Sequence, residues 1–334
     1  MRIATYNVEW FANLFDDDNG LVLDGSWSSR RDVTKAEQGA AIAHVLKAID
    51  ADAVLIVEAP DQNSKRGTVA ALESFTKEFS LRTTDAIIGF SNDTQQEIAL
   101  LFDPNVLSAQ HDPKSAPDAP RFDQTLDIDL DVDERGDTVV FSKPPLELVV
   151  TPKSGEPFRL IGAHLKSKAP HGARNRDEVM RISIANRRKQ LAQAIWLRRR
   201  IVDHLTAGDA LIVLGDLNDG PGLDEYEGLF GRSSVEIVMG EEGENCLTDP
   251  HARQALGQRL AARPTTSRFY LRHEGRYLQA LLDYIMVSQE LAARAPKWRI
   301  WHPFDDPECW ADEALRQALL TASDHFPVTL DIAL

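Results

Sequence analysis

Apolar and polar residues alternate in many short stretches of the chain and recur at helical spacing in a few longer ones. The first stretch, MRIATYNVEW, has a period of two and predicts a β-strand. Other apolar or alternating stretches also predict strands: DAVLIVEAP (52–60), AIIGF (86–90), EIALLFD (97–103), VVFSKPPLELVV (139–150), FRLIGAHLKS (158–167), ALIVLGDLND (210–219), ALLDYIMVS (280–288) and PVTLDIAL (327–334). The chain is therefore expected to be rich in strands.

Three stretches carry helical signals. Thr34 and Glu37 have the spacing of a capping box, and apolar residues at 42, 45, 46 and 49 form one face of the helix that follows. A second helix is predicted over about 68–79, and a long arginine-rich helix over about 178–205. Many strands, few helices and no proline- or glycine-rich linker predict one α+β domain over 1–334, with helices outside two mixed β-sheets.

Residues 104–136 are rich in Pro, Asp and Ser and are expected to form a variable loop or insertion. Within them, LDIDLDVDE alternates acidic and apolar residues. An EF-hand loop starting at Asp127 would need Gly and Glu where Val132 and Thr138 stand, so a strand with one acidic face is the better interpretation. The acidic run DDDNG (16–20) is typical of a turn.

Composition limits the partners and the location. Hydrophobic residues make up 43% of the chain and charged residues 27%, which is normal for a globular protein. The 37 basic and 52 acidic residues give a net charge of −15, so duplex nucleic acid would be repelled unless a local basic groove exists. Cys246 and Cys309 are too few for a disulfide framework or a zinc site. Without a signal sequence or an apolar run of about 18 residues, we expect a soluble cytoplasmic protein.

Polar residues stand where several apolar strands end or are interrupted. They are Asn7, Glu58, His164, Asp216, Asn218, Asp283, Asp324 and His325. Each alone is typical of a turn or cap. Because strand ends at one rim of a β-sandwich converge, together they predict a single cluster. Crowded carboxylates need a cation or a histidine among them, which favours a hard divalent ion such as Mg²⁺ or Mn²⁺.

The stretches TYNVEW, VEAP, HLKSK, GDLND, LDYIMVS and SDHFPV resemble, in this order, motifs of the endonuclease/exonuclease/phosphatase (DNase I-like) superfamily. That group includes pancreatic-type DNases, abasic-site endonucleases, inositol-polyphosphate 5-phosphatases and sphingomyelinases. The resemblance implies a four-layer α-β-β-α sandwich that hydrolyses phosphoesters with one or two Mg²⁺ or Mn²⁺ ions. It implies that Glu58 and Asn7 hold the metal, with Asp324 as a nearby or second-metal ligand.

The resemblance also implies catalytic roles. His325 would be the catalytic histidine, oriented by Asp283. Asp216 would position or deprotonate the attacking water, or protonate the leaving oxygen. Asn218 and His164 would donate to the phosphoryl oxygens. Hydrolysis of a phosphoester needs this combination of charge stabilisation and proton transfer.

Clues to the substrate come from three places. TSRFYLRHEGRYLQA resembles a hairpin of bacterial nuclease-type members, although its aromatic residues could instead simply pack into a sheet. The hairpin residues that could meet a phosphate chain or stack on bases are Arg268, Phe269, Tyr270, Arg272 and Arg276. Lys166 would add a charge near the phosphate, or be merely exposed, and Lys143 stands where such relatives tend to have arginine. The arginines of the long helix are expected to divide between acidic neighbours and the site.

The leading interpretation is a nuclease or phosphodiesterase that acts on short, single-stranded or small phosphodiesters. No protein partner is predicted. A phosphomonoesterase or a lipid or inositol phosphatase is the alternative within the same chemistry. A catalytically silent binding scaffold is the alternative outside it, and the presence of all the motif carboxylates and of the terminal histidine disfavours it.

Overall fold

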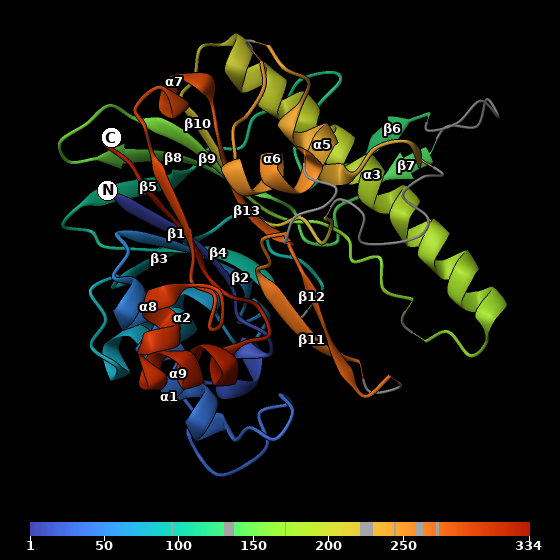
Figure 1. The fold of residues 1–334 in the computed structure, drawn as a ribbon. Helices are drawn as coiled ribbons and strands as arrows, with labels where there is room; N and C mark the ends of the chain where they lie inside the picture. Colours follow the sequence, from blue (N-terminus) through green and yellow to red (C-terminus); the bar gives the residue numbers. More distant parts are fainter. Residues whose placement is uncertain are drawn as a thin grey trace.

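Two β-sheets form the centre of the computed structural model (Figure 1). The structure describes residues 1–94, 96–129, 137–170, 172–220, 230–243, 245–257, 263–271 and 274–334. The first sheet has the order β14 (Lys297–Ile300), β15 (Val328–Asp331), β1 (Arg2–Asn7), β2 (Ala53–Ala59), β4 (Glu97–Phe102) and β3 (Asp85–Ile88). The second has the order β13 (Asp283–Val287), β10 (Leu211–Asp216), β9 (Phe158–His164), β8 (Leu146–Pro152) and β5 (Leu107–His111).

Both sheets are mixed, as the sequence predicts. Strands β1 and β2 are parallel, and so are β9 and β10, whereas the other neighbours in these two sheets are antiparallel. Two separate hairpins are formed by β6 (Leu126–Ile128) with β7 (Asp137–Val139), and by β11 (Ser267–Leu271) with β12 (Arg276–Ala280).

Helices cover the outer face of each sheet. One core packs the first sheet against α1 (Lys35–Ile49), α2 (Thr68–Glu78), the 3-10 helix η1 (Phe11–Leu14), α8 (Pro307–Ala311) and α9 (Glu313–Ala322). A second core packs the other sheet against α3 (Arg176–Thr206), α5 (Ser234–Met239) and α6 (Pro250–Gly257), and α7 (Gln289–Ala292) follows β13. A third core, with Leu55, Leu160 and Ile212 among its residues, fills the space between the sheets. The expected four-layer α-β-β-α sandwich is confirmed.

Local sequence signals explain where the helices begin. Thr34 caps α1 in the predicted capping box, since its side chain accepts from the Glu37 N–H and the Glu37 carboxylate accepts from the Thr34 N–H. Asn175 caps α3, which begins two residues before its predicted start. None of the helices described here combines the length and the apolar character needed to cross a membrane.

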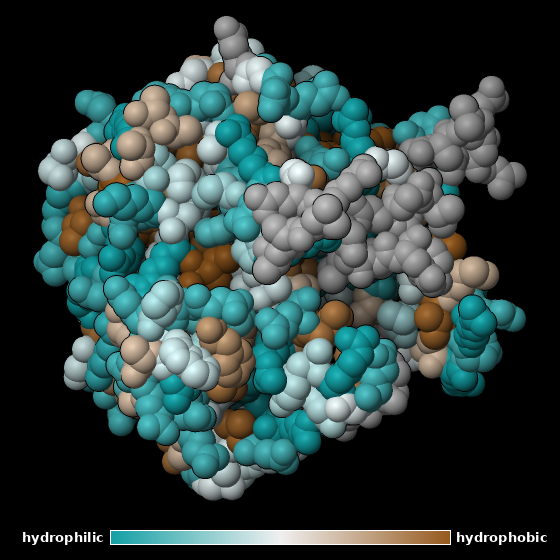
Figure 2. All heavy atoms as spheres, viewed as in Figure 1, coloured by the Kyte–Doolittle hydropathy of each residue, from teal (hydrophilic) through white to brown (hydrophobic). Residues whose placement is uncertain are grey.

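The described part of 104–136 contains two strands, since β5 pairs with β8 and β6 pairs with β7. In β6 the alternation of LDIDLDVDE does place Leu126 and Ile128 inside and Asp127 outside, whereas residues 130–136 lie outside the described part of the chain. The predicted strand 139–150 is broken between Val139, the end of β7, and Leu146, the start of β8; Pro144 and Pro145 lie in this break, since proline cannot donate to a sheet ladder. Figure 2 shows one face of the molecule, on which most of the coloured surface is hydrophilic.

Candidate functional site

The polar strand ends that the sequence singles out meet at one rim of the sandwich. The strand register places Asp216 of β10 opposite both Asp283 of β13 and His164 of β9. Asn7, at the end of β1 in the other sheet, donates from Nδ2 to Oδ2 of Asp216 over 3.1 Å. This buried hydrogen bond links the two sheets where their polar ends converge.

His325 and Asp283 form a buried pair, with 2.8 Å between Nδ1 and Oδ2. The same carboxylate oxygen accepts from the hydroxyl of Thr266 over 2.7 Å, and Oγ1 of Thr266 in turn accepts from the Asp283 N–H over 3.0 Å. Burial lowers the pKa of His325, but the neighbouring carboxylates, first that of Asp283, outweigh it and raise the pKa well above its ordinary value. The geometry therefore favours a charged, fixed imidazole.

The start of the β11–β12 hairpin holds the Asp324–His325 loop in place. A β-bridge joins Ser267 to His325. The Arg268 N–H donates to the Asp324 carbonyl over 2.7 Å, and the Phe326 N–H donates to the Thr266 carbonyl over 2.6 Å. The hairpin thus fixes both the main chain of the loop and, through Thr266, the acid that faces the histidine.

The main chain around Asp216, the last residue of β10, is tightly constrained. Gly215 before it has φ +131°, and a Cβ atom at this glycine would lie 2.0 Å from the Ala163 carbonyl oxygen, so only glycine fits. After it, Asn218 donates to Asp216 from its main-chain N–H over 2.7 Å and from Nδ2 over 3.2 Å. Burial and the nearby Asp283 carboxylate raise the pKa of Asp216 to about 7.

The amide of Asn218 is already engaged. Its Nδ2 donates to the Leu165 carbonyl over 3.0 Å as well as to Asp216. An amide has two N–H groups, so donation to a phosphoryl oxygen would require Asn218 to release one of these bonds. The geometry makes Asn218 a residue that positions Asp216 in this structure.

Three cavity-lining residues have left-handed backbone conformations, which are unusual for side chains other than glycine. They are Trp10 (φ 60°), Glu58 (φ 61°) and Asn218 (φ 51°). Glu58 occupies an irregularity in the β2–β4 pairing, where the register shifts between Val57 and Ala59. Such strain is of the order of 1–3 kcal/mol per residue and is concentrated at functional sites in proteins.

Several carboxylates line the cavity, among them those of Glu9, Glu58 and Asp324. Burial raises the pKa of Asp324 to about 7, and the charge of Glu9 adds to this effect. Burial also raises the pKa of Glu58, again with a contribution from Glu9. Glu9 pairs with Arg30, and Oδ1 of Asn7 is buried without a hydrogen-bond partner. Crowded carboxylates beside an unsatisfied amide oxygen are suitable ligands for a hard divalent cation.

Another acidic cluster fits a metal less well. Asp216, Asp283 and His325 offer ligand atoms within 4.8 Å of one another. However, Asp283 and His325 already share a direct hydrogen bond, which a metal bound between them would have to replace. The group of Glu58, Asn7 and Asp324 therefore fits a metal better than this cluster does.

The cavity between these groups has a volume of about 880 Å³ and one basic wall. Nζ of Lys143 lies 3.3 Å from Nδ1 of His164. Burial, together with the charge of Lys143, lowers the pKa of His164 well below its ordinary value, so this imidazole is neutral. Lys166 and Arg187 also line this wall.

The side chains of the β11–β12 hairpin lie on two faces, and only one of these faces lines the cavity. Phe269, Leu271 and Leu278 line the cavity, and the Phe269 ring lies 5.4 Å from that of His325. Arg268 and Tyr270 are not among the described residues that line it, because strand alternation directs them to the other face. There the Arg268 guanidinium lies 3.4 Å from the ring centre of Tyr277, and the Tyr270 ring packs at a tilt against that of Tyr277.

Arg276, the other described arginine of the hairpin, is not among the residues that line the cavity either. Arg276 is exposed and pairs with Glu274, with 2.5 Å between Nε and Oε2. Arg272 lies outside the described residues. The described part of the hairpin therefore contributes apolar side chains to the cavity wall.

Sequence reasoning missed several residues of the site. Thr266 is the first residue of the TSRFYLRHEGRYLQA stretch, but its role depends on hairpin pairing that no local pattern reveals. Glu9 could have been found, because it stands two residues after Asn7.

The arginines of the long helix are expected to divide between acidic neighbours and the site. Arg187 does both, since it lines the cavity and donates to buried Asp219 over 2.9 Å.

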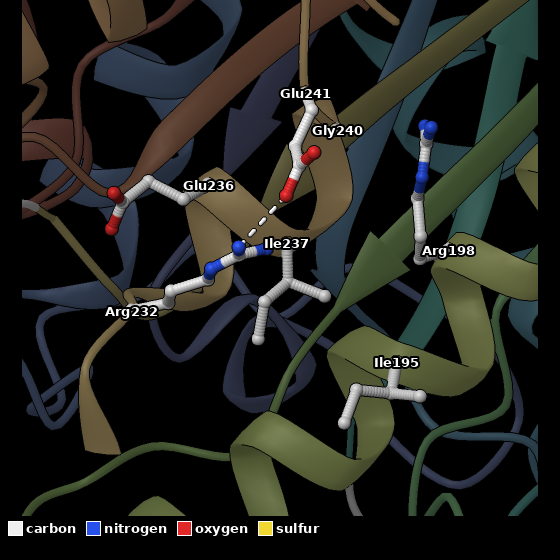
Figure 3. A pocket seen from close by; sticks show the side chains of 7 residues that line it. All are labelled: Ile195, Arg198, Arg232, Glu236, Ile237, Gly240 and Glu241. Carbon is white, nitrogen blue, oxygen red and sulfur yellow. Dashed lines mark hydrogen bonds and ion pairs between the residues drawn. The ribbon is translucent and has the colours of Figure 1, made fainter. Parts of the chain in front are cut away.

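A second hollow, of about 510 Å³, lies between α3 and α5 (Figure 3). Arg232 pairs there with Glu241 over 2.7 Å, and Nη2 of Arg198 donates to the Asn245 carbonyl over 2.6 Å. Both guanidinium groups have protein partners, and none of the strand-end residues lines this hollow. It is separate from the candidate site.

Comparisons with solved structures agree with the fold. The chain resembles truncated TDP2 of Caenorhabditis elegans, with a TM-score of 0.52, 14% identity, and 99% of this chain and 97% of that chain covered. It resembles D. rerio TDP2 complexed with single strand DNA product, with a TM-score of 0.51, 12% identity, and coverage of 100% and 99%. It also resembles the 3′ phosphatase NExo from Neisseria bound to product DNA hairpin, with a TM-score of 0.50, 16% identity, and both chains fully covered.

No curated protein sequence matches the chain significantly. A family match nevertheless covers almost all of it: residues 4–325 match Exo_endo_phos, the Endonuclease/Exonuclease/phosphatase family. The span includes every polar strand end from Asn7 to His325. The chemistry of this family is the hydrolysis of phosphoester bonds, generally with a divalent metal. The chain belongs to the endonuclease/exonuclease/phosphatase family.

Proposed function

We propose that the protein is a phosphodiesterase that depends on Mg²⁺ or Mn²⁺, and that its substrate is a single-stranded or short nucleic acid. The observation that carries this proposal is the Asp283–His325 pair beside Asp216, next to a cavity that is lined by carboxylates and by Lys143. A phosphodiester needs both: groups that move protons, and positive charge around its oxygens.

His325 and Asp216 are the two groups that would transfer protons, one as a donor and the other as an acceptor. Nδ1 of His325 is bonded to Asp283, which leaves Nε2 to donate to a phosphoryl or leaving oxygen. Asp216 is an acceptor whose pKa, at about 7, lies close to neutral pH, as is favourable for a general base. We assign removal of the water proton to Asp216 and donation to the phosphate to His325.

The basic wall would hold the phosphate. Lys143 and Lys166 supply positive charge to its oxygens, and neutral His164 supplies an N–H donor. Asn218 keeps Asp216 in position through its two hydrogen bonds to that carboxylate. These assignments retain the predicted site but change the part of Asn218 from phosphate donor to positioning residue.

Glu58, Asn7 and Asp324 would hold the metal, and Glu9 adds charge beside them. A divalent cation bound there would neutralise the crowded carboxylates and polarise a phosphoryl oxygen. The unsatisfied Oδ1 of Asn7 and the raised pKa values of Glu58 and Asp324 support this placement, since each is relieved by a nearby cation.

Hydrolysis of bis-p-nitrophenyl phosphate with Mg²⁺ or Mn²⁺, with and without a chelator, tests the proposal. We expect activity that the chelator abolishes and that His325→Ala lowers by several orders of magnitude without loss of the fold. Metal-dependent turnover by His325→Ala at the wild-type rate would contradict the assignment. No activity on any phosphoester would favour the silent scaffold.

A second comparison, of activity on different substrates, decides which class of phosphoester the protein hydrolyses. The matched substrates are the monoester p-nitrophenyl phosphate, a plasmid and a single-stranded oligonucleotide. One of the similar structures holds a single-stranded DNA product and another is a 3′ phosphatase, so both ester types belong in the assay. The net charge of −15 favours the single strand over the duplex plasmid. Preference for the monoester would establish a phosphomonoesterase instead.

A further inference from the structure

One face of α3 continues beyond the cavity that it helps to line. Ser183 and Arg187 line the cavity and stand four residues apart on this helix. Continuing the same spacing toward the N-terminus leads to Val179, Met180 and Arg176, since residues three or four apart share a helix face. We call these three residues the α3 extension. The cavity wall and the α3 extension thus form one surface.

The α3 extension is uncovered. Met180 is 47% exposed and Val179 is 37% exposed, and Arg176 is exposed as well. In Figure 1 the N-terminal turns of α3 project beyond both sheets at the right of the view. At the same edge of Figure 2, apolar and hydrophilic side chains lie next to one another. From Arg187 to Arg176 the helix rises about 16 Å, well beyond the reach of one phosphoester group.

The charged and apolar side chains of the α3 extension together indicate which ligand it would bind. Arg176 offers positive charge and Val179 and Met180 offer apolar contact, directly continuous with a cavity suited to phosphodiesters. A single-stranded nucleic acid presents phosphates and unpaired bases side by side and can use both kinds of contact. A duplex presents its phosphates outward and keeps its bases stacked inside, so the two apolar side chains would gain no apolar partner.

We propose that the α3 extension binds the nucleotides of a single strand that lie beyond the scissile phosphate. This rests on the proposed function and deepens it. The affinity for an oligonucleotide would then rise with its length, because a longer strand reaches the α3 extension. A small phosphodiester would occupy only the cavity.

The test measures binding separately from hydrolysis. A fluorescent single-stranded oligothymidylate is titrated with the His325→Ala protein, and the same measurement is made after adding Arg176→Ala with Met180→Ser. We expect a roughly fivefold to tenfold higher Kd, a weaker salt dependence, and loss of the gain in affinity from dinucleotide to longer strand. The matched control is Arg181→Ala, because Arg181 is also exposed but lies about 140° around the helix from Arg176.

Three results would overturn the proposal. They are equal weakening by Arg181→Ala, an affinity that does not depend on strand length, and tighter binding of a duplex of the same sequence. Hydrolysis of bis-p-nitrophenyl phosphate by wild-type protein reports on the proposed function alone, so its failure is distinguishable from failure of the α3 extension. Unchanged hydrolysis of this small ester by the Arg176→Ala, Met180→Ser protein is the expected companion result.

Discussion

Nδ1 of His325 lies 2.8 Å from Oδ2 of Asp283, although 42 residues separate the two in sequence. The same Asp283 oxygen also accepts the Thr266 hydroxyl, so a three-residue chain of hydrogen bonds fixes the imidazole. Its orientation and its charge therefore depend on side chains that need not contact the substrate.

The first prediction concerns this chain of hydrogen bonds. Asp283→Asn is expected to lower kcat by about 10²- to 10⁴-fold, because the amide neither stabilises the charged imidazole nor sets its tautomer. Thr266→Val should have a smaller effect of the same kind. Steady-state kinetics on bis-p-nitrophenyl phosphate, with circular dichroism as the folding control, measures both. Wild-type kcat in a folded Asp283→Asn protein would remove the aspartate from the mechanism.

The second prediction concerns the metal. Glu58→Gln should raise the metal concentration for half-maximal activity by roughly tenfold or more, because it removes a charged oxygen ligand. Metal should also raise the Tm of the wild-type protein more than that of the variant, since a cation that binds only the folded state stabilises it. The Tm measurement requires no turnover. Equal metal-induced shifts in both proteins would place the ion elsewhere.

The third prediction concerns stability. Arg187 and Asp219 form a buried ion pair with 2.9 Å between Nη1 and Oδ1. Arg187→Met leaves a buried carboxylate with one partner fewer and should lower the free energy of unfolding by about 3–5 kcal/mol. The matched control is Arg232→Met, which breaks the exposed pair with Glu241 and should cost less than about 1 kcal/mol. Similar denaturant midpoints for the two variants would contradict this prediction.

The fourth prediction concerns pH. Burial lowers the pKa of His251 to about 4. Between the folded value and the ordinary value of 6.5 the unfolded chain binds a proton that the folded chain does not, so this stabilising contribution is present above pH 6.5 and is lost as the pH falls. The loss amounts to at most about 3 kcal/mol.

His251→Asn isolates this contribution. Burial raises the pKa of the neighbouring Asp249 to about 6, and its protonation partly offsets the loss on acidification. Because the variant keeps Asp249, the difference in unfolding free energy between wild type and variant reports mainly on the histidine. Urea titrations from pH 4 to 7 should show the wild type losing stability relative to the variant toward acid pH. Parallel pH profiles would mean that His251 is freely protonated in the folded state.

Much of the fold is predictable from the sequence, since apolar alternation marks the central strands and the Thr34–Glu37 box marks the start of α1. The rim residues are predictable for a related reason: each polar side chain follows or interrupts an apolar strand, and such strand ends converge. Residues brought in by long-range pairing are not predictable this way. Thr266 reaches Asp283 only because the hairpin pairs with the Asp324–His325 loop.

The inward face of the hairpin could not be predicted from the sequence either. Alternation gives the strand Arg268–Leu271 two faces, but it does not indicate which of them points to the cavity. The bridge between Ser267 and His325 sets that choice and places Phe269 inside. Likewise, the two engaged N–H groups of Asn218 could be recognised only from its neighbours in space.

Strand β15 lies between β14 and β1, so residues near 328 pair with residues near 5 in the first sheet. During synthesis on the ribosome, β1 leaves the exit tunnel soon followed by its neighbour β2, but long before its other partner, β15, exists. The cluster at the rim can close only after residues 324–331 have emerged, and an incomplete nascent chain therefore carries no assembled site. Premature termination anywhere before His325 would yield a protein that lacks this centre altogether, whatever part of it folds.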